Sequence, residues 1–432
     1  MKRLVVYFLI GCVFVSAGSI SLAADHMTLE DSIRMAIENN PGMKAQDQDV
    51  MGSDMDKRAQ FAQMLPKIDL SYGYLRYQDV QTVKLPLGPT TVSVPLTSKG
   101  NYELDVQAKQ ILFAGGALYN SYLIAKNDEF AAKINREAYA RNLKLLVIDA
   151  YYAVIRARQQ RELAKSNVSS VKSHLDVANA FFGQGMIPKN DLLEAQVQYA
   201  DSEQQLITAD NAVKIAESNL NLLLVRNLME EVNIDSEIPV TPLEISFDQS
   251  LATALETRQE IRTTKLQIDN SEKGVSIAKS YFMPNVAATL GYENLKGTDP
   301  TLRYDTWKTG LGLNWNLFEG GEGYWNYHKA QYMNAKAGYL LESLKNQVTL
   351  EVKNSYLNIQ EAQARLQVAE KAIAQAEEYV RIEKDRYNLQ VATTTDVLTA
   401  QTLLVRAQDN YINARADQAR AKAALRAAMG TL

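Results

Sequence analysis

The sequence has little material for thiol or metal chemistry. Its 432 residues include one cysteine and three histidines. The histidines, His26, His174 and His328, lie too far apart in the sequence to form a metal-ligand motif. No glycine-rich phosphate loop follows a predicted strand, and we find no nucleophile motif. We therefore expect neither an enzyme nor a bound metal or cofactor.

A strong charge imbalance and long apolar runs are also missing. Lys and Arg together number 46 against 50 Asp and Glu, and a net charge of −4 does not predict a nucleic-acid partner. No stretch beyond the N-terminus approaches about 18 consecutive apolar residues, which argues against a membrane-spanning helix. Strands of an outer-membrane barrel stay possible, because their alternating residues leave only a weak hydropathy signal.

Residues 1–23 are expected to be an export signal. Lys2 and Arg3 precede an apolar run, and small residues up to Ala23 suit a signal-peptidase site. The run, about a dozen residues long, is too short to cross a bilayer as a helix. A second interpretation is lipidation of Cys12, although the apolar run continues past it. If cleavage follows Ala23, the mature chain has no cysteine and no disulfide.

The most informative feature that the sequence does contain is an internal duplication. The segment Gln-Ile-Leu-Phe-Ala-Gly-Gly, which ends at Gly116, returns as Trp-Asn-Leu-Phe-Glu-Gly-Gly, which ends at Gly321, an offset of 205 residues. The same offset carries Asp191 onto Asp396. A constant offset over such a length indicates two copies of one structural unit.

The duplication divides the chain into two repeats and a linker. Upstream of the Gly-Gly pairs, Pro66 corresponds to Pro284, so the offset there is 218 and repeat one holds 13 extra residues. We expect those residues to form a loop. Repeat one is assigned to residues 24–237, a Pro-containing linker to 238–245, and repeat two to 246–432. Each repeat is expected to begin with short helices.

Each repeat contains two stretches in which apolar and polar residues alternate. In the first stretch Ile68, Leu70 and Tyr72 alternate with polar or small residues, the period of a strand with one apolar face. Aromatic residues near the strand ends suit the interfaces of an outer-membrane barrel, but a soluble half-buried sheet produces the same alternation. The strands are predicted at about 67–76, 102–113, 285–294 and 306–317.

After each Gly-Gly pair the apolar period becomes helical. Leu366, Ile373 and Val380 recur every seven residues, which favours long helices packed as coiled coils. Only a short break separates the two helices of each repeat, so they are expected to be antiparallel. A filamentous or bundle protein is the simpler explanation of such helices alone. The long helices are predicted at about 117–181, 190–228, 322–387 and 394–430.

Four strands per chain are too few to close a barrel in lipid. An open sheet edge in hydrocarbon leaves backbone groups unpaired, at several kcal/mol each. Two copies would supply eight strands, and the interior of such a barrel is filled by its own side chains. Three copies would supply twelve, the smallest number here that leaves a pore. We therefore expect identical subunits to complete the sheet, with the polar strand faces turned toward water.

These features resemble the TolC-type outer-membrane efflux protein family over essentially the whole mature chain. The resemblance is carried by the duplication, by the strand–Leu-Phe-x-Gly-Gly–helix junction, and by the aromatic-x8-Asp-Leu/Val-Leu-x-Ala-Gln turn. It implies a mixed α+β, mostly α fold. The implied protomer is one of three that share a 12-stranded outer-membrane β-barrel, continued by a long α-helical coiled-coil tunnel.

The resemblance also implies a function and partners. It predicts a passive exit duct from periplasm to exterior in the Gram-negative outer membrane, as part of a tripartite efflux or type I secretion system. The implied partners are two further copies of the chain, a periplasmic adaptor protein, an inner-membrane pump and outer-membrane lipid. The alternatives are a periplasmic adaptor or a soluble coiled-coil scaffold. Adaptors, however, carry one helical hairpin rather than a duplicated unit of strands and helices.

By the same resemblance, the turns between the long helices form the periplasmic entrance. Its expected gate residues are Asp191, Asp396, Tyr387, Asn190 and Thr395. The two aspartates have a simpler interpretation as helix caps, which is compatible with a gating role. Some family members carry a Gly, an Arg and a second Asp on the second turn. This sequence has Gln390, Ala392 and Thr399 there, so an arginine lock and a doubled acidic ring are not predicted.

The remaining candidate residues are turn and junction positions. The turns are candidates for adaptor docking, with ordinary turn packing as the alternative. The Gly-Gly pairs are expected to bend the chain from strand into helix, since a residue without Cβ accepts the required angles. The turn candidates are Gly183, Gly185, Met186, Ile187, Pro188 and Val391, and the junction candidates are Gly115, Gly116, Gly320 and Gly321.

Overall fold

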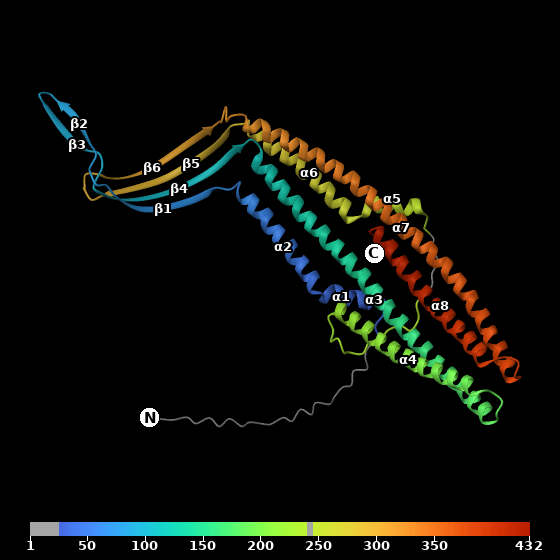
Figure 1. Cartoon of the computed structure of the whole chain (residues 1–432). Coiled ribbons are helices and arrows are strands. Elements are labelled where there is room, and N and C mark those ends of the chain that lie inside the picture. Colours follow the sequence, from blue (N-terminus) through green and yellow to red (C-terminus); the bar gives the residue numbers. More distant parts are fainter. Residues whose placement is uncertain (1–25, 240–244) are drawn as a thin grey trace, which may run out of the picture.

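The computed structural model describes residues 26–239 and 245–432. A curved sheet lies at one end of an elongated molecule and long helices extend from it to the other end (Figure 1). The predicted export signal and Cys12 lie outside the described residues, as does most of the predicted linker. No helix in the described ranges has both the length and the apolar character needed to cross a membrane.

The two repeats have nearly the same helices. In repeat one they are α1 (Leu29–Asn39), α2 (Pro41–Ala62), α3 (Ala117–Gly183) and α4 (Lys189–Leu224). In repeat two they are α5 (Phe247–Thr257), α6 (Gln259–Ser280), α7 (Glu322–Asn388) and α8 (Thr394–Ala428). Helices α3 and α7 each have 67 residues, a length of about 100 Å at 1.5 Å per residue.

Equivalent signals start the first helix of each repeat. Thr28 and Asp31 form a capping box at α1, and Ser246 and Gln249 form one at α5. In both, the side chains satisfy backbone N–H groups that the first helical turn leaves without a partner. The repeat seen in the sequence is therefore also a repeat of local structure.

Helix α4 is shorter than the sequence predicts. It ends at Leu224 rather than near 228, because Val225 adopts a left-handed conformation with φ of 59° and terminates the helix. The Asn221 side-chain amide then donates to the carbonyl of Glu230, at 2.7 Å, which holds the following turn against the helix end. The heptad pattern does not reveal this stop, since valine is not a usual left-handed residue.

The main sheet has four antiparallel strands in the order β1-β4-β5-β6. The strands are β1 (Lys67–Arg76), β4 (Gly100–Ala114), β5 (Asn285–Gly297) and β6 (Arg303–Asn314). Strands β4 and β5 pair Val106 with Tyr292, so the repeats join at the centre of the sheet. Strand β6 ends three residues before the predicted limit, where the Trp315 indole turns aside to donate to the carbonyl of Phe282, at 3.2 Å.

The extra residues of repeat one form a second sheet rather than the expected loop. Strands β2 (Thr82–Leu87) and β3 (Thr90–Pro95) pair as a hairpin that projects beyond the end of the main sheet (Figure 1). The two-residue connection Gly88-Pro89 suits a tight hairpin turn, and Gly88 has a φ of 63°. The alternation of Val83, Leu85 and Leu87 was the available strand signal.

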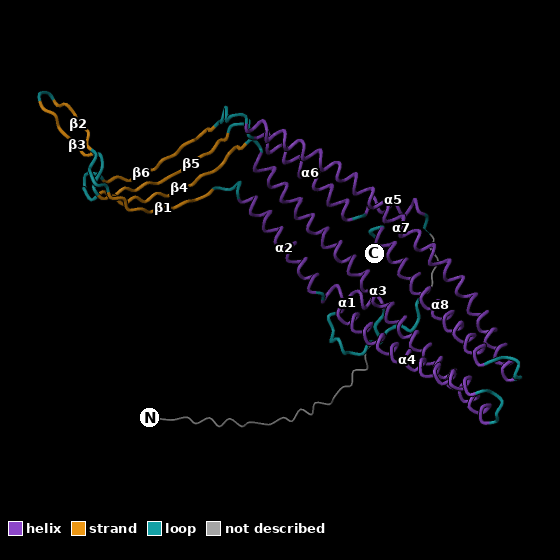
Figure 2. The backbone as a smooth tube through the Cα atoms, in the orientation of Figure 1, coloured by secondary structure: helices purple, strands orange, loops and turns teal. Residues whose placement is uncertain are grey.

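Paired glycines connect the sheet to the long helices. Gly115, Gly116, Gly320 and Gly321 all have φ between 59° and 85°. Gly116 and Gly321 are the N-caps of α3 and α7. A Cβ on Gly115 would lie 2.6 Å from the Cβ of Ser280, so that position also lacks room for a side chain. Figure 2 shows the resulting change from strand to helix at the same level in both repeats.

The main apolar core lies where the short helices cover the long ones. One cluster packs α1 against α3 and α4, and a second packs α5 against α7 and α8. The buried Arg141 of α3 donates to Glu260 of α6 at 2.7 Å and so ties repeat one to repeat two. Burial of Glu260 opposes its charge, but Arg141 and Arg258 outweigh this and lower the pKa of that carboxyl to about 2.

Candidate channel entrance and open sheet edges

The turn between α3 and α4 is made by backbone conformation. Gly185 has a φ of 72°, and the N–H of Met186 returns to the carbonyl of Phe181 at 2.9 Å. This pattern closes the C-terminus of a helix with a left-handed glycine. Pro188 precedes α4 and offers no side-chain cap. Gly183, Gly185, Met186 and Pro188 are exposed, and Ile187 packs partly onto the small cluster formed by Ala178, Leu192 and Ala195.

The turn between α7 and α8 has the same backbone path but different side chains. The N–H of Val391 returns to the carbonyl of Arg386 at 2.9 Å. Gln390 takes the left-handed place of Gly185, with a φ of 61°. Thr393 and Asp396 then form a capping box at the start of α8, in contrast to the uncapped α4.

The expected gate aspartates occupy unequal environments. Asp396 accepts hydrogen bonds from the backbone N–H and the hydroxyl of Thr393, both at 2.8 Å, and these bonds lower the pKa of its carboxyl. Its capping interpretation therefore holds. Asp191 lies in the first turn of α4 and accepts from the Asn190 amide at 2.9 Å, without capping the helix. Both carboxylates are only partly covered in the single chain.

Tyr387, the expected aromatic of the gate, is buried inside the single chain at 4% exposure. Its ring lies 4.9 Å from His174 and 5.6 Å from Phe181, both on α3. The hydroxyl of Thr394 donates to its oxygen at 3.3 Å. We call the turn between α3 and α4 the tip of repeat one and the turn between α7 and α8 the tip of repeat two. Tyr387 thus holds the tip of repeat two against α3 of repeat one, and its ring is not presented to open solvent.

A direct bond between the two tips involves a residue that sequence reasoning missed. The hydroxyl of Thr395 on α8 donates to the Glu194 carboxylate on α4, at 2.9 Å to the nearer oxygen. Thr395 was expected at the entrance and Glu194 was not. Glu194 lies three residues after Asp191 within the helical motif, so its position on the same turn was the available signal. The structure therefore brings Thr395, Asp191 and Asp396 to one end of the molecule.

His174 is a second residue that the sequence did not single out. Its side chain is 7% exposed and its Nε2 atom has no hydrogen-bond partner among the described residues. Burial and the nearby Lys384 ammonium lower the pKa of His174 to about 4. The imidazole is therefore neutral at neutral pH and packs as an aromatic group.

The main sheet has two open edges and two unlike faces. Every residue of β1 and nearly every residue of β6 is exposed, and neither strand has an outer neighbour among the described residues. One face carries exposed apolar groups such as Ile68, Trp307 and Leu311 at 69–77% exposure. The opposite face carries Glu293, which accepts from the Tyr304 hydroxyl at 2.5 Å and pairs with Lys308.

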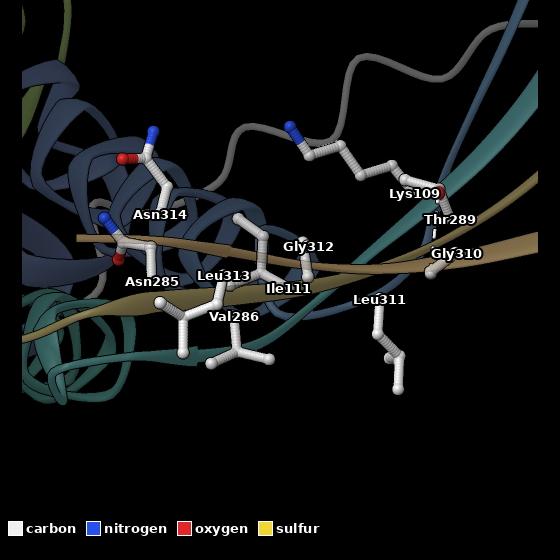
Figure 3. Close-up of a pocket in the computed structure, with 11 residues that line it drawn as sticks. Lys109, Ile111, Asn285, Val286, Thr289, Gly310, Leu311, Gly312, Leu313 and Asn314 are labelled. Atoms are coloured by element: carbon white, nitrogen blue, oxygen red, sulfur yellow. Dashed lines mark hydrogen bonds between the residues drawn. The ribbon is translucent and has the colours of Figure 1, made fainter.

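A hollow of about 650 Å³ lies against the exposed side of β6 near the helices. Figure 3 shows Lys109 and Asn314 on one side of the sheet, with Leu311 and Val286 on the other. Gly310 and Gly312 line the hollow, and because they have no side chains the polar side of β6 is unfilled at this point. The hollow therefore lies over the edge of the sheet, against residues of β4, β5 and β6, and is not an enclosed small-molecule site. In the described ranges no three His, Cys, Asp or Glu side chains are grouped to hold a metal.

The duplication, the two-faced sheet with its exposed edge strands and the long helical body are together the architecture expected of an outer-membrane channel protein. A profile of the outer membrane efflux protein family matches residues 32–225 and 251–431, which is most of both repeats. The chain belongs to this family. It is an outer-membrane efflux or secretion channel, and neither a periplasmic adaptor nor a soluble scaffold.

Curated relatives have names that agree with this assignment, and solved structures share the fold. The chain is 23% identical over 437 residues to the outer membrane protein TolC of Vibrio cholerae, covering 97% of this chain and 94% of that protein. It is 23% identical to the alkaline protease secretion protein AprF of Pseudomonas aeruginosa, covering 94% and 84%. The structure of VceC from Vibrio cholerae has a TM-score of 0.78 at 19% identity, covering 93% of this chain and 96% of that one.

The structure of the open state of the MtrE channel from Neisseria gonorrhoeae has the same fold. Its TM-score is 0.76 at 17% identity, and it covers 93% of this chain and 88% of that chain. At such low identity the likeness concerns the fold alone. The similarity nevertheless extends through the sheet, the short helices and the long helices together.

Proposed function

We propose that three copies of this chain form a passive duct from the periplasm to the exterior, in which no reaction takes place. The observation that carries the proposal is the pair of open edges on a four-stranded sheet. Neighbouring strands are antiparallel throughout the sheet, so the two edge strands, β1 and β6, run in opposite directions. When two copies are placed side by side, β6 of one copy and β1 of the next are therefore also antiparallel. Three copies then give a closed ring of even strand number without a change of pairing type.

The two sheet faces match the two surroundings that such a barrel needs. The exposed apolar face would meet lipid, where it needs no protein neighbour. The face with Glu103, Asp105, Glu293 and Lys308 would line water in the lumen. Closure would also supply partners for the backbone groups of β1 and β6, whose exposure in hydrocarbon is costly.

The helical tips supply an independent argument for a neighbouring copy. The offset of 205 residues relates Tyr387 to Phe182 and Tyr379 to His174. Within one chain Tyr387 and His174 cover each other, at 4% and 7% exposure. The equivalent pair, Phe182 and Tyr379, is 39% and 37% exposed. Repetition of the same contact around a ring would cover Phe182 of one copy with Tyr379 of the next.

Disulfide trapping tests this arrangement. The double variant Phe182→Cys/Tyr379→Cys, in a Cys12→Ser background, is expected to form covalent dimers and trimers upon mild oxidation. The matched variant Tyr387→Cys/His174→Cys is expected to close within one chain and to give no covalent dimer. Native mass in detergent should equal three chains. A monodisperse single chain in detergent, or equal dimer formation by both variants, would contradict the trimer.

At the entrance we propose that Asp191 and Asp396, with Asn190, Thr395 and Glu194, make a negative rim. Carboxylates around a narrow opening favour cations over anions. Asp191→Ala/Asp396→Ala is expected to reduce the cation preference measured from reversal potentials of single channels in a salt gradient. Asp248→Ala, at the first turn of α5 and away from the tips, is the control. An unchanged preference in the double variant would remove the aspartates from the entrance.

We further propose that the helical turns meet a periplasmic adaptor that connects the duct to an inner-membrane pump. The turns are exposed at the end of the molecule opposite the sheet, and Met186 and Val391 present apolar side chains there at 47% and 62% exposure. A photoreactive amino acid at Met186 or Val391 is expected to capture an adaptor in cells. The same group at Leu222, on the exposed side of α4 far from the turn, is the control. Equal capture at all three positions would contradict tip docking.

A further inference from the structure

The hairpin β2–β3 is the largest structural difference between the two repeats. Its strands pair Val83 with Val94 and Leu85 with Val92, and cross-strand partners project from the same face of a sheet. Leu87 extends that face toward the turn. The opposite face carries Lys84, Ser93, Thr82 and Thr91. The hairpin is therefore an amphipathic ribbon with one continuous apolar face.

Nothing in the described part of the chain covers the apolar face. The side chains of Val83, Leu85, Leu87, Val92 and Val94 are 37–62% exposed. An isolated two-stranded ribbon is marginally stable in water, and packing of an apolar face is the usual remedy. The ribbon therefore needs a covering surface that residues 26–239 and 245–432 of the single chain do not supply.

The position of the hairpin argues against the lipid core as that surface. A membrane strand needs about 9–11 tilted residues, and the main strands already have 10 to 15. The hairpin begins beyond their outer ends, after a break in the ladder between Tyr77 and Gln81. The Ser98 hydroxyl lies 2.6 Å from that of Thr298 and pins the base of the hairpin to the β5–β6 connection. The ribbon thus starts at the barrel rim.

The hairpin also lies next to the open edge of the sheet. It connects β1, the edge strand, to β4, so in the proposed trimer each ribbon rises beside a boundary between copies. Three identical apolar faces around one mouth can cover one another, which no single copy achieves alone. The polar faces with Lys84 would then remain in water.

We propose that the three β2–β3 hairpins of a trimer pack together through these apolar faces and form a lid over the outer mouth of the duct. The occupant of each face is the hairpin of another copy. This inference rests on the proposed trimer. It adds an outer closure, at the end of the duct opposite the helical entrance.

Cysteine crosslinking in intact outer membranes tests the lid, with Cys12→Ser as the background. Leu85→Cys is expected to give covalent dimers with a short bismaleimide, at least tenfold more than Lys84→Cys on the opposite face of the same strand. Native mass of both variants shows whether the trimer is present. An intact trimer with no Leu85→Cys crosslink, or with equal crosslinking at Lys84→Cys, would overturn the lid and leave the duct standing. Absence of the trimer would overturn both.

Conductance gives a second and independent test. Leu85→Asp/Val92→Asp places carboxylates on the apolar face and should separate the ribbons, so single-channel conductance is expected to rise at least twofold. Lys84→Asp changes charge on the polar face and is expected to leave conductance unchanged. A double variant with unchanged conductance would contradict a lid. So would quenching by a lipid-phase quencher of a fluorophore attached at Leu85→Cys, which would place that face in the membrane.

Discussion

The two helical tips have one backbone path and two means of holding it. In repeat one the turn relies on Gly185 and starts the next helix without a side-chain cap. In repeat two Gln390 adopts the same left-handed conformation, and a capping box starts α8. The second tip therefore depends on side-chain interactions where the first depends on backbone freedom. Duplication preserved the shape of the turn while its stabilising contacts diverged.

The tips differ further in what surrounds their aromatic residue. Tyr387 is packed against α3 of its own chain, whereas the equivalent Phe182 is exposed. The same side-chain position thus serves as a core residue in one repeat and as a surface residue in the other. We infer that Phe182 is exposed because the residue that would cover it, Tyr379, belongs to another copy of the chain in the proposed trimer. A difference in local sequence is not needed to explain it.

The largest expected effect comes from Tyr387→Ala. Deleting a buried aromatic ring typically costs about 3–5 kcal/mol. Hydrogen exchange of amides 388–400 should therefore report a much easier opening of the repeat-two tip. Phe182→Ala, followed at the equivalent amides 183–195, is the matched control, and in monomeric chains these amides should lose little protection. In the proposed trimer the loss of protection in Phe182→Ala should approach that in Tyr387→Ala. Equal and small effects in both states would contradict the packing role of the ring.

Acidification should loosen the tip of repeat two, where Tyr387 packs on His174, and should not loosen the tip of repeat one. His174 has a pKa of about 4 in the folded tip, below its ordinary value near 6.5, so the folded state binds fewer protons. The contribution of the neutral imidazole to the free energy of unfolding of this tip is complete above about pH 6.5 and is lost as the pH falls toward 4. At pH 5 the loss is roughly 2 kcal/mol.

Hydrogen exchange of the repeat-two tip at pH 5 and pH 7, corrected for intrinsic rates, measures this loss. His174→Gln should abolish the difference between the two pH values. The contact proposed between Phe182 of one copy and Tyr379 of the next contains no imidazole and should show no such dependence. A pH effect that persists in His174→Gln would assign it to another group.

Loss of the α8 cap is expected to have a smaller effect. Thr393→Ala removes the hydroxyl that accepts from the Asp396 N–H, at a cost of about 1 kcal/mol. It also removes a hydrogen bond to the Asp396 carboxylate, so the pKa of that group should rise toward its ordinary value when followed by carboxyl NMR. Pro188→Ala, at the equivalent place in repeat one, removes no cap and should cost less. A larger loss in Pro188→Ala would reverse the comparison.

The smallest effect concerns the left-handed residue of each turn. Gln390→Gly should stabilise the second turn, and Gly185→Ala should destabilise the first, each by up to about 1 kcal/mol. Together the two substitutions exchange the backbone properties of the tips. Protection of the amides of Met186 and Val391 provides the measurement. Destabilisation by Gln390→Gly would indicate that the glutamine side chain has a contact role that the single chain does not reveal.

Much of the architecture followed from sequence patterns that act locally. Alternation placed strands β1, β4, β5 and β6 to within a few residues, because the side-chain period of a strand is two. Heptads placed the long helices, and the Gly-Gly pairs marked where strand becomes helix. The same alternation was present at Val83, Leu85 and Leu87, but interpretation as a loop was wrong there because the surplus length in one repeat suggested an insertion without order.

What the sequence alone determined is the repeat, the type of each segment and the shortage of strands. Periods and turn residues are set by neighbours along the chain, so they can be recognised without knowledge of the fold. Only the tertiary structure decided that β1 and β6 have no outer neighbour among the described residues. It also decided that Tyr387 is buried on His174 and that Thr395 contacts Glu194 between the two helical hairpins. Such contacts join residues about 200 positions apart, and their geometry depends on how two long helical hairpins pack rather than on any local pattern.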